Sequence, residues 1–143
     1  MRLQILKLII SLIFAGVLTG ISSAVEAAPK DEQIKVAQAV EKIAAGAQLL
    51  DVRTKEEWDD GHLKGAKLVT LSDKGFAEKV KAVFDPKKPL VVYCGSGNRS
   101  AKATKHLRDG GFTSVFDMAG GIYIWEKEGN PIVKDPAPAN PNR

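Results

Sequence analysis

Short apolar runs alternate with amphipathic segments along most of the chain. Apolar runs of about five residues, bounded by glycine, proline or charged residues, predict strands. Apolar positions at three- and four-residue spacing, closed by glycine or Asp-Pro, predict helices. On this basis the chain is expected to form strands over 48–52, 66–71, 90–94 and 114–118, and helical segments over 31–45, 55–61, 76–84, 100–109 and 122–127.

The alternation of strands and helices indicates the fold class. Elements of these lengths in this order are typical of an α/β domain with a mostly parallel sheet, flanked by helices on both faces. Ligands in such domains bind at the carboxyl ends of the strands. The strand over 90–94 reads Leu-Val-Val-Tyr-Cys between Pro89 and Gly95, so it is expected to be fully buried and to end at Cys94.

The first 27 residues are predicted to be a secretory signal peptide rather than part of the fold. Arg2 and Lys7 precede an apolar run of about 14 residues that ends in small residues, and such a run is shorter than the roughly 20 needed to span a bilayer. Cleavage after Ala24 or after Ala27 fits the pattern. We therefore expect a periplasmic or secreted protein with no stable membrane insertion after cleavage. The alternative is an uncleaved N-terminal anchor, which would still place the domain outside the cytoplasm.

The remaining sequence fits one folded domain over 31–133, followed by a disordered tail. The 143 residues are 44% hydrophobic and 27% charged, which suits a globular domain. The segment 134–143 alternates proline with alanine and asparagine and is predicted to be disordered.

The charge balance is mildly basic. The net charge is +4, and cleavage after Ala27 would leave 19 basic and 16 acidic residues, a net charge of +3. These charges are interspersed, whereas nucleic-acid binding requires clustered Lys and Arg on one face. The balance mildly favours small anionic substrates.

The single cysteine, Cys94, excludes an internal disulfide. One cysteine with two widely separated histidines also does not make a metal site, so no metal is expected. A lone thiol in an oxidising compartment is a liability unless it is buried or used. Taken alone, a cysteine that ends a buried strand is most often a small core residue.

The loop after this cysteine indicates a functional thiol. Gly95 and Gly97 permit backbone angles that turn successive N–H groups inward, and the following helix presents its free N–H groups to the same point. Arg99 adds a permanent charge with donors suited to sulfonate or phosphate oxygens. A thiol in this cradle should have a lowered pKa and be abundant as thiolate at neutral pH. The predicted site is Cys94, Gly95, Ser96, Gly97, Asn98, Arg99 and Ser100.

Three segments of the chain resemble the rhodanese family. Cys94-x-x-Gly97-x-Arg99-Ser100 resembles its active-site loop. The segment 49–66, which contains Leu-Leu-Asp-Val-Arg, Glu-Trp and Gly-His-Leu, resembles the first family signature. The segment 120–132, which contains Gly-Gly-Ile and a tryptophan, resembles the second.

This resemblance implies a five-stranded parallel sheet and a sulfurtransferase that needs no cofactor. Sulfane sulfur would pass from thiosulfate or a related anionic donor, through a Cys94 persulfide cradled by the loop, to a thiol or cyanide. Gly95 and Ser96 are small and neutral where some thiosulfate-using members carry a basic residue. That departure favours an alternative function, a persulfide carrier or partner-docking module that exchanges sulfur with other proteins and turns over small donors slowly.

The loop length separates sulfur chemistry from phosphate chemistry. Cys94 to Arg99 has the spacing Cys-x4-Arg, whereas cysteine phosphatases, including those that share this fold, resemble Cys-x5-Arg, in which the extra residue makes room for a phosphate. Tyr93 also stands where many phosphatases have histidine. Both features favour a single sulfur atom as the ligand, with phosphatase or arsenate reductase activity as the lesser alternative.

Asp51, Arg53 and His62 are candidates for supporting roles. Asp51 and Arg53 lie at the end of a predicted strand, and we expect an internal ion pair that fixes the loop; the alternative is that Arg53 attracts an anionic donor. His62 is expected to form a structural hydrogen bond rather than to act as a general base.

Overall fold

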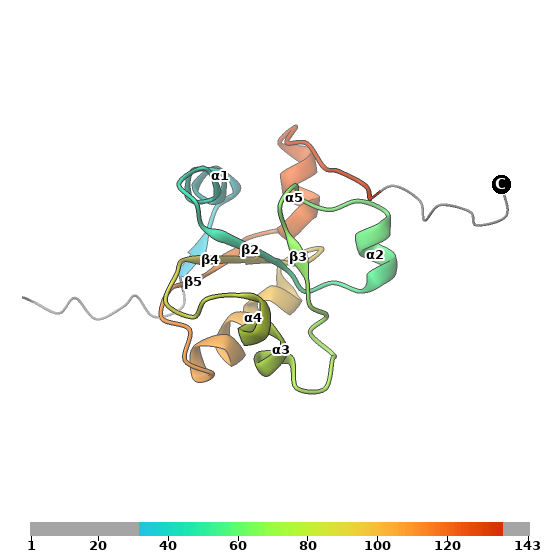
Figure 1. The fold of residues 1–143 in the computed structure, drawn as a ribbon. Helices are drawn as coiled ribbons and strands as arrows, with labels where there is room; N and C mark the ends of the chain where they lie inside the picture. Colours follow the sequence, from blue (N-terminus) through green and yellow to red (C-terminus); the bar gives the residue numbers. More distant parts are fainter. Residues whose placement is uncertain (1–31, 136–143) are drawn as a thin grey trace, which may run out of the picture.

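The computed structural model describes residues 32–135 as an α/β domain (Figure 1). Strands and helices alternate along the whole described chain. The strands are β1 (Glu32–Ile34), β2 (Gln48–Asp51), β3 (Lys67–Leu68), β4 (Leu90–Tyr93) and β5 (Val115–Met118). The helices are α1 (Val36–Ala44), α2 (Lys55–Asp59), α3 (Phe76–Val83), α4 (Asn98–Asp109) and α5 (Gly121–Lys127).

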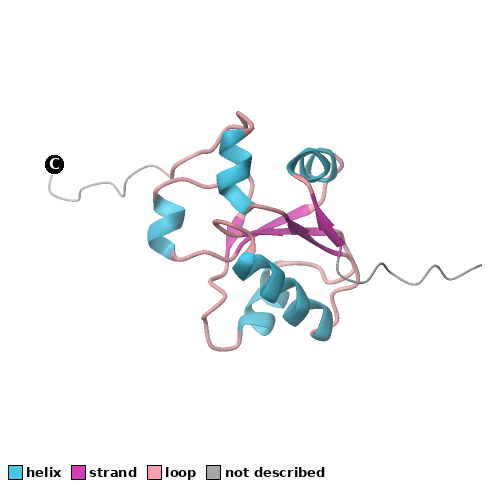
Figure 2. Cartoon of the chain, turned by 180° about the vertical axis from the view of Figure 1, so that it is seen from behind, coloured by secondary structure: helices cyan, strands magenta, loops and turns pink. Residues whose placement is uncertain are grey.

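The five strands form one parallel sheet in the order β1-β5-β4-β2-β3. Helices α1 and α5 cover one face of the sheet and α3 and α4 the other, while α2 lies beyond the end of β2 (Figures 1 and 2). This is the predicted class: a five-stranded parallel sheet with helices on both faces. The central strand, β4, is buried along its whole length, as expected for an uninterrupted apolar run covered on both sides.

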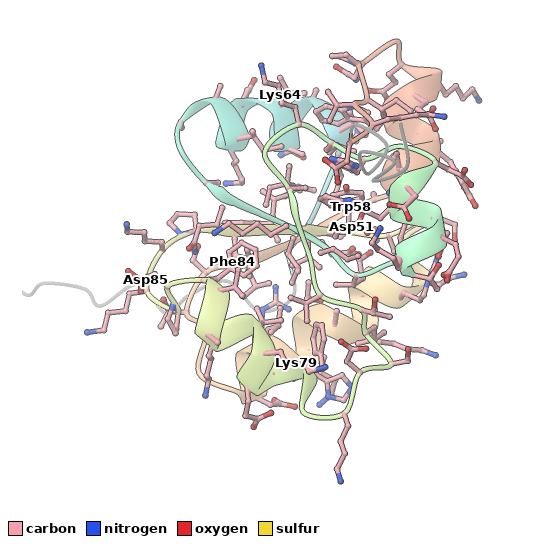
Figure 3. All side chains as sticks on the ribbon, turned by 45° about the vertical axis from the view of Figure 1, so that its right-hand side comes forward. Asp51, Trp58, Lys64, Lys79, Phe84 and Asp85 are labelled. Carbon is pink, nitrogen blue, oxygen red and sulfur yellow. The ribbon has the colours of Figure 1, made fainter. Side chains whose placement is uncertain are left out.

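The alternating directions of the β-strand side chains divide the core into two clusters. Leu90 and Val92 of β4 face α3 and α4 and pack with Leu107, whereas Val91 and Tyr93 face α1 and α5. Cys94 continues the first series. In Figure 3, Phe84 lies between the end of α3 and the sheet, whereas Asp85, next to it in the chain, lies at the edge.

The first predicted helix is wrong at its start. The sequence predicts a helix over 31–45, but residues 32–34 form the edge strand β1, which pairs in parallel with β5. The apolar residue Ile34 fits the pattern of a helix or of a strand, and pairing with β5 stabilises the strand. The strand predicted over 66–71 is also shorter than expected: Lys67 and Leu68 are the residues in register with β2, and beyond them the Val69 N–H still donates to the Asp51 carbonyl oxygen.

The two predicted terminal segments fall largely outside the described residues. The predicted signal peptide, 1–27, lies entirely outside them. No helix within 32–135 has the length and hydropathy needed to cross a bilayer. Lys134 and Asp135, the start of the predicted tail, are described, and Asp135 contacts the domain through Trp58.

Candidate active site

Cys94 lies directly after β4, at the carboxyl end of the central strand and before the N-terminus of α4. The residue is 1% exposed, and its Sγ accepts a hydrogen bond from the Gly97 N–H at 3.1 Å. The Ser100 Oγ lies 3.6 Å from the same sulfur and 3.1 Å from the Gly97 carbonyl oxygen. Because a hydroxyl has one proton, Ser100 can donate to only one of these acceptors at a time. An anionic sulfur would draw that proton toward itself.

The surroundings of Cys94 lower its pKa in spite of burial. Burial alone raises the pKa of a thiol, because the thiolate loses solvation. The Ser100 hydroxyl and the backbone N–H groups of Ser100, Gly97 and Arg99 act in the opposite direction and outweigh burial. The pKa of Cys94 therefore lies below its ordinary value. The strongest favourable contributions come from these neutral donors, and the Arg99 guanidinium also interacts with the thiolate.

Helix α5 fixes the loop from its other side. Its Ile122 N–H donates to the Cys94 carbonyl oxygen at 2.9 Å, and the Tyr123 N–H donates to the Gly95 carbonyl oxygen at 3.2 Å. Gly121 has φ +56°, and a Cβ there would lie 2.3 Å from the Cys94 carbonyl oxygen. Only glycine allows this approach, so the Gly-Gly pair at the start of α5 shapes the cysteine loop directly.

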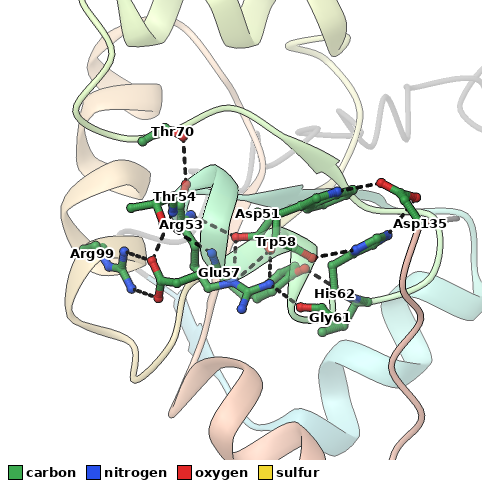
Figure 4. A network of polar contacts seen from close by, with 12 residues as sticks. Asp51, Arg53, Thr54, Glu57, Trp58, Gly61, His62, Thr70, Arg99 and Asp135 are labelled. Carbon is green, nitrogen blue, oxygen red and sulfur yellow. Dashed lines mark hydrogen bonds and ion pairs between the residues drawn. The ribbon is translucent and has the colours of Figure 1, made fainter. Parts of the chain in front are cut away.

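Arg99 forms a bidentate ion pair with Glu57 of α2. Its two terminal nitrogens donate to the two Glu57 carboxylate oxygens, both at 2.6 Å (Figure 4). The Thr54 backbone N–H also donates to Glu57 at 3.0 Å and completes a capping box at the start of α2. The Arg99 guanidinium holds the pKa of the Glu57 carboxyl down at about 2. Two of the five N–H donors of Arg99, and its positive charge, are thus engaged by a residue that the sequence did not single out as part of the site.

Asp51 and Arg53 form a buried ion pair beneath the loop that contains α2. The Arg53 Nε donates to both Asp51 carboxylate oxygens at 3.0 and 2.9 Å, and its Nη2 lies 2.7 Å from Asp51 Oδ2. The same nitrogen donates to the Gly61 carbonyl oxygen at 2.7 Å. Asp51 is 0% exposed and Arg53 5% exposed. This geometry ties the end of β2 to the end of α2 and gives Arg53 a structural partner.

His62 is part of an aromatic stack at the C-terminal end of α2. Its ring lies 3.5 Å from that of Trp58 at an angle of 6°, and its Nδ1 is 3.2 Å from the Trp58 carbonyl oxygen. The Trp58 Nε1–H donates to Asp135 at 2.8 Å (Figure 4). The His62 backbone pairs with Val133. These contacts are structural, and they fasten the end of the described chain to α2.

The predicted loop residues come together around the sulfur, with differing contributions. Gly97 and Ser100 approach Sγ directly, whereas the side chains of Ser96 and Asn98 are exposed. The residues of the first signature approach the loop through Glu57, and those of the second through Gly121 and Tyr123. Among residues 32–135, no cluster of three or more His, Cys, Asp or Glu side chains suitable for a metal ion occurs.

Comparison with known proteins identifies the rhodanese family. The model of the rhodanese-like domain matches residues 35–128. The chloroplastic thiosulfate sulfurtransferase 16 of Arabidopsis thaliana is 39% identical over 107 residues, which are 68% of this chain and 89% of that protein. Thiosulfate sulfurtransferase 18 of the same plant is 32% identical over 125 residues, 78% of this chain and 92% of that protein.

A solved structure extends the likeness to the fold. The crystal structure of a rhodanese-related protein from Thermoplasma volcanium superposes with a TM-score of 0.64 at 31% identity. The match covers 73% of this chain and 99% of the Thermoplasma protein.

Proposed function

Because the chain belongs to the rhodanese family, we propose that it is a sulfurtransferase that carries sulfur as a persulfide on Cys94. The single observation that carries this proposal is the geometry around Sγ. The buried Sγ accepts a hydrogen bond from the Gly97 N–H at 3.1 Å and lies 3.6 Å from the Ser100 hydroxyl at the N-terminus of α4, and this setting lowers the pKa of the thiol. Such donors stabilise a thiolate and would stabilise a persulfide anion in the same place.

The proposed reaction has two displacements at sulfur. In the first, the Cys94 thiolate attacks the outer sulfur of thiosulfate or a related donor. The bond between the two donor sulfurs breaks, and sulfite leaves with the electron pair. In the second, a thiolate or cyanide attacks the outer sulfur of the Cys94 persulfide, the new S–S or S–C bond forms, and Cys94 leaves as thiolate. Neither step needs an external oxidant or reductant, and neither needs a cofactor.

The loop chemistry also separates this proposal from phosphate chemistry. The donors within hydrogen-bond distance of Sγ are the neutral Gly97 N–H and Ser100 O–H groups, and the charge of Arg99, which also interacts with Cys94, is balanced by Glu57. A phosphate dianion would require those Arg99 donors for itself. A single sulfur requires only the backbone donors and the hydroxyl, which already point at Sγ.

The ion pair between Arg99 and Glu57 also supports a second candidate function, that of a persulfide carrier. Arg99 is engaged by Glu57, and Gly95 and Ser96 supply no charge. A free dianionic donor therefore meets few uncommitted cationic groups at the loop. Slow reaction with thiosulfate, together with fast loading from a protein persulfide, would identify the protein as a carrier.

We also propose that the domain acts outside the cytoplasm, in the periplasm or after secretion. The support is the N-terminal pattern of two basic residues, an apolar run and small residues. The protein would be isolated from the periplasmic or the secreted fraction. Its intact mass then distinguishes cleavage after Ala24, cleavage after Ala27 and an uncleaved chain.

The pH dependence of Cys94 alkylation tests the cradle. Thiolate is the reactive form, so its fraction and the rate with iodoacetamide rise as pH increases through the pKa of Cys94. We expect the inflection of the folded protein to lie below that of the unfolded chain, whose thiol titrates at about 8.5. Ser100→Ala removes the hydroxyl donor and should move the inflection upward.

Thr104→Val provides the matched control. The Thr104 hydroxyl lies one turn further along α4 and donates to the Ala101 carbonyl oxygen, so its loss should leave the inflection unchanged. An inflection of the folded wild-type protein at or above that of the unfolded chain would refute the cradle.

A further inference from the structure

A cavity of about 260 Å³ lies beside the cysteine loop, between α2 and α5. Three of its lining residues also contact the loop. Glu57 holds Arg99, the Ile122 N–H donates to the Cys94 carbonyl oxygen, and Tyr123 borders Gly95, where a Cβ would lie 3.2 Å from the Tyr123 ring and hydroxyl. The other lining residues are Arg53, Asp60, Gly61, Glu126 and Ile132. A molecule in this cavity would therefore lie next to the loop that bears Cys94.

The cavity is acidic, although the chain as a whole is basic. Its lining has three carboxylates, Glu57, Asp60 and Glu126, and a single guanidinium, Arg53. Arg53 is neutralised by Asp51, and Glu57 is neutralised by Arg99. Asp60 and Glu126 are exposed, and neither lies within ion-pair distance of a cation in residues 32–135. Two uncompensated negative charges thus stand at the cavity.

An exposed aromatic ring completes the lining. Tyr123 is 61% exposed, the largest exposure among the big apolar side chains of the described domain. Its backbone N–H donates to the Gly95 carbonyl oxygen, which places the residue between the loop and the cavity. The face of a tyrosine ring attracts cations. An aromatic face and two free carboxylates are independent features that both favour a positively charged ligand.

We infer that this cavity receives the sulfur acceptor and selects thiols that carry a positive charge near the sulfur. The inference rests on the proposed function and specifies its second step. The acceptor thiolate attacks the outer sulfur of the Cys94 persulfide, the bond to Sγ breaks, and the acceptor leaves as a persulfide. Its cationic group would lie between Asp60, Glu126 and the Tyr123 ring. An anionic acceptor would meet two like charges at the same position.

Discharge of preloaded Cys94 persulfide by three small thiols tests the inference. The acceptors are cysteamine, which is cationic, 2-mercaptoethanol, which is neutral, and 3-mercaptopropionate, which is anionic. Single-turnover rates are measured for the wild type and for Asp60→Asn/Glu126→Gln. For each thiol, the rate of the variant is divided by the rate of the wild type, so the intrinsic reactivity of the thiol cancels. The matched control, Glu41→Gln/Glu78→Gln, makes the same change of charge at exposed positions on α1 and α3.

The two neutralising substitutions should act in opposite directions on the charged thiols. At low salt we expect cysteamine to react about three- to tenfold more slowly and 3-mercaptopropionate about three- to tenfold faster, as Coulomb interactions of two partly solvated charges allow. The rate with 2-mercaptoethanol should change less than about twofold, and the charged-thiol effects should shrink at high salt.

Each contrary outcome has a distinct meaning. Equal ratios for all three thiols, or the same pattern in the α1/α3 control, overturn the inference and leave the proposed function intact. Failure of Cys94 to load with sulfur overturns the proposed function and the inference with it.

Discussion

Cys94→Ala and Cys94→Ser should abolish sulfur transfer from thiosulfate to cyanide. We expect a loss of about three orders of magnitude or more, the scale on which removal of a catalytic nucleophile acts. Cys94 is the only cysteine in the chain, so no second thiol can substitute for it. A serine hydroxyl in the same cradle stays protonated and does not form the persulfide.

The measurement is initial-rate thiocyanate formation by the purified variants. Both substitutions are small, and circular dichroism with urea unfolding checks that the variants are folded. Substantial transferase activity in folded Cys94→Ala would contradict the assignment of Cys94 as the sulfur carrier.

Asp51→Ala should destabilise the domain by about 3–5 kcal/mol, because it leaves a buried guanidinium without its carboxylate. Arg53 is 5% exposed and would retain the Gly61 carbonyl oxygen as its one remaining acceptor in the present geometry. The loss is large compared with the 5–15 kcal/mol that is typical of whole domains. Urea unfolding of the two proteins at constant pH measures the difference.

Replacing both partners shows whether the stability loss in Asp51→Ala comes from an unpaired buried charge or from a general packing defect. Asp51→Leu/Arg53→Met replaces the pair by apolar side chains, and such replacements are often close to neutral in stability. We therefore expect the double variant to recover most of the free energy of unfolding lost in Asp51→Ala. A single variant that loses less than about 1 kcal/mol, the scale of an exposed pair, would contradict the structural role given to this ion pair.

The centre of the fold and of the candidate site can be predicted from the sequence because its elements are consecutive in the chain. The buried strand β4, the glycine loop and helix α4 follow one another within 20 residues. Their apolar run, glycines and helix start are each visible without a partner. In the structure, Gly97 and Ser100 approach Sγ as the loop pattern predicts.

The features that the sequence does not reveal depend on contacts between residues far apart in the chain. Strand β1 has three residues and is fixed by its register with β5, some 80 residues later in the chain. The ion pair between Glu57 and Arg99 joins residues 42 positions apart. The capping box from Thr54 to Glu57 is visible in the sequence, but it indicates only a helix start. That the same carboxylate also holds Arg99 follows only from the packing of α2 against the loop.

The C-terminal segment shows the same limit. The proline-rich composition beyond Lys134 predicts disorder, and it contains no sign that Asp135 accepts a hydrogen bond from Trp58. Likewise, the acidic cavity combines residues of α2 and α5, two short helices that approach each other only in the folded domain.

The most direct test of the account is the intact mass of the purified protein before thiosulfate, after thiosulfate and after subsequent cyanide. We predict a gain equal to one sulfur atom, located on Cys94 by peptide mapping, that cyanide removes with formation of an equal amount of thiocyanate. The Cys94→Ala variant should gain nothing. A gain only from a persulfide donor would favour the carrier function over turnover of thiosulfate. No sulfur adduct from either donor would contradict the central claim that Cys94 carries sulfur.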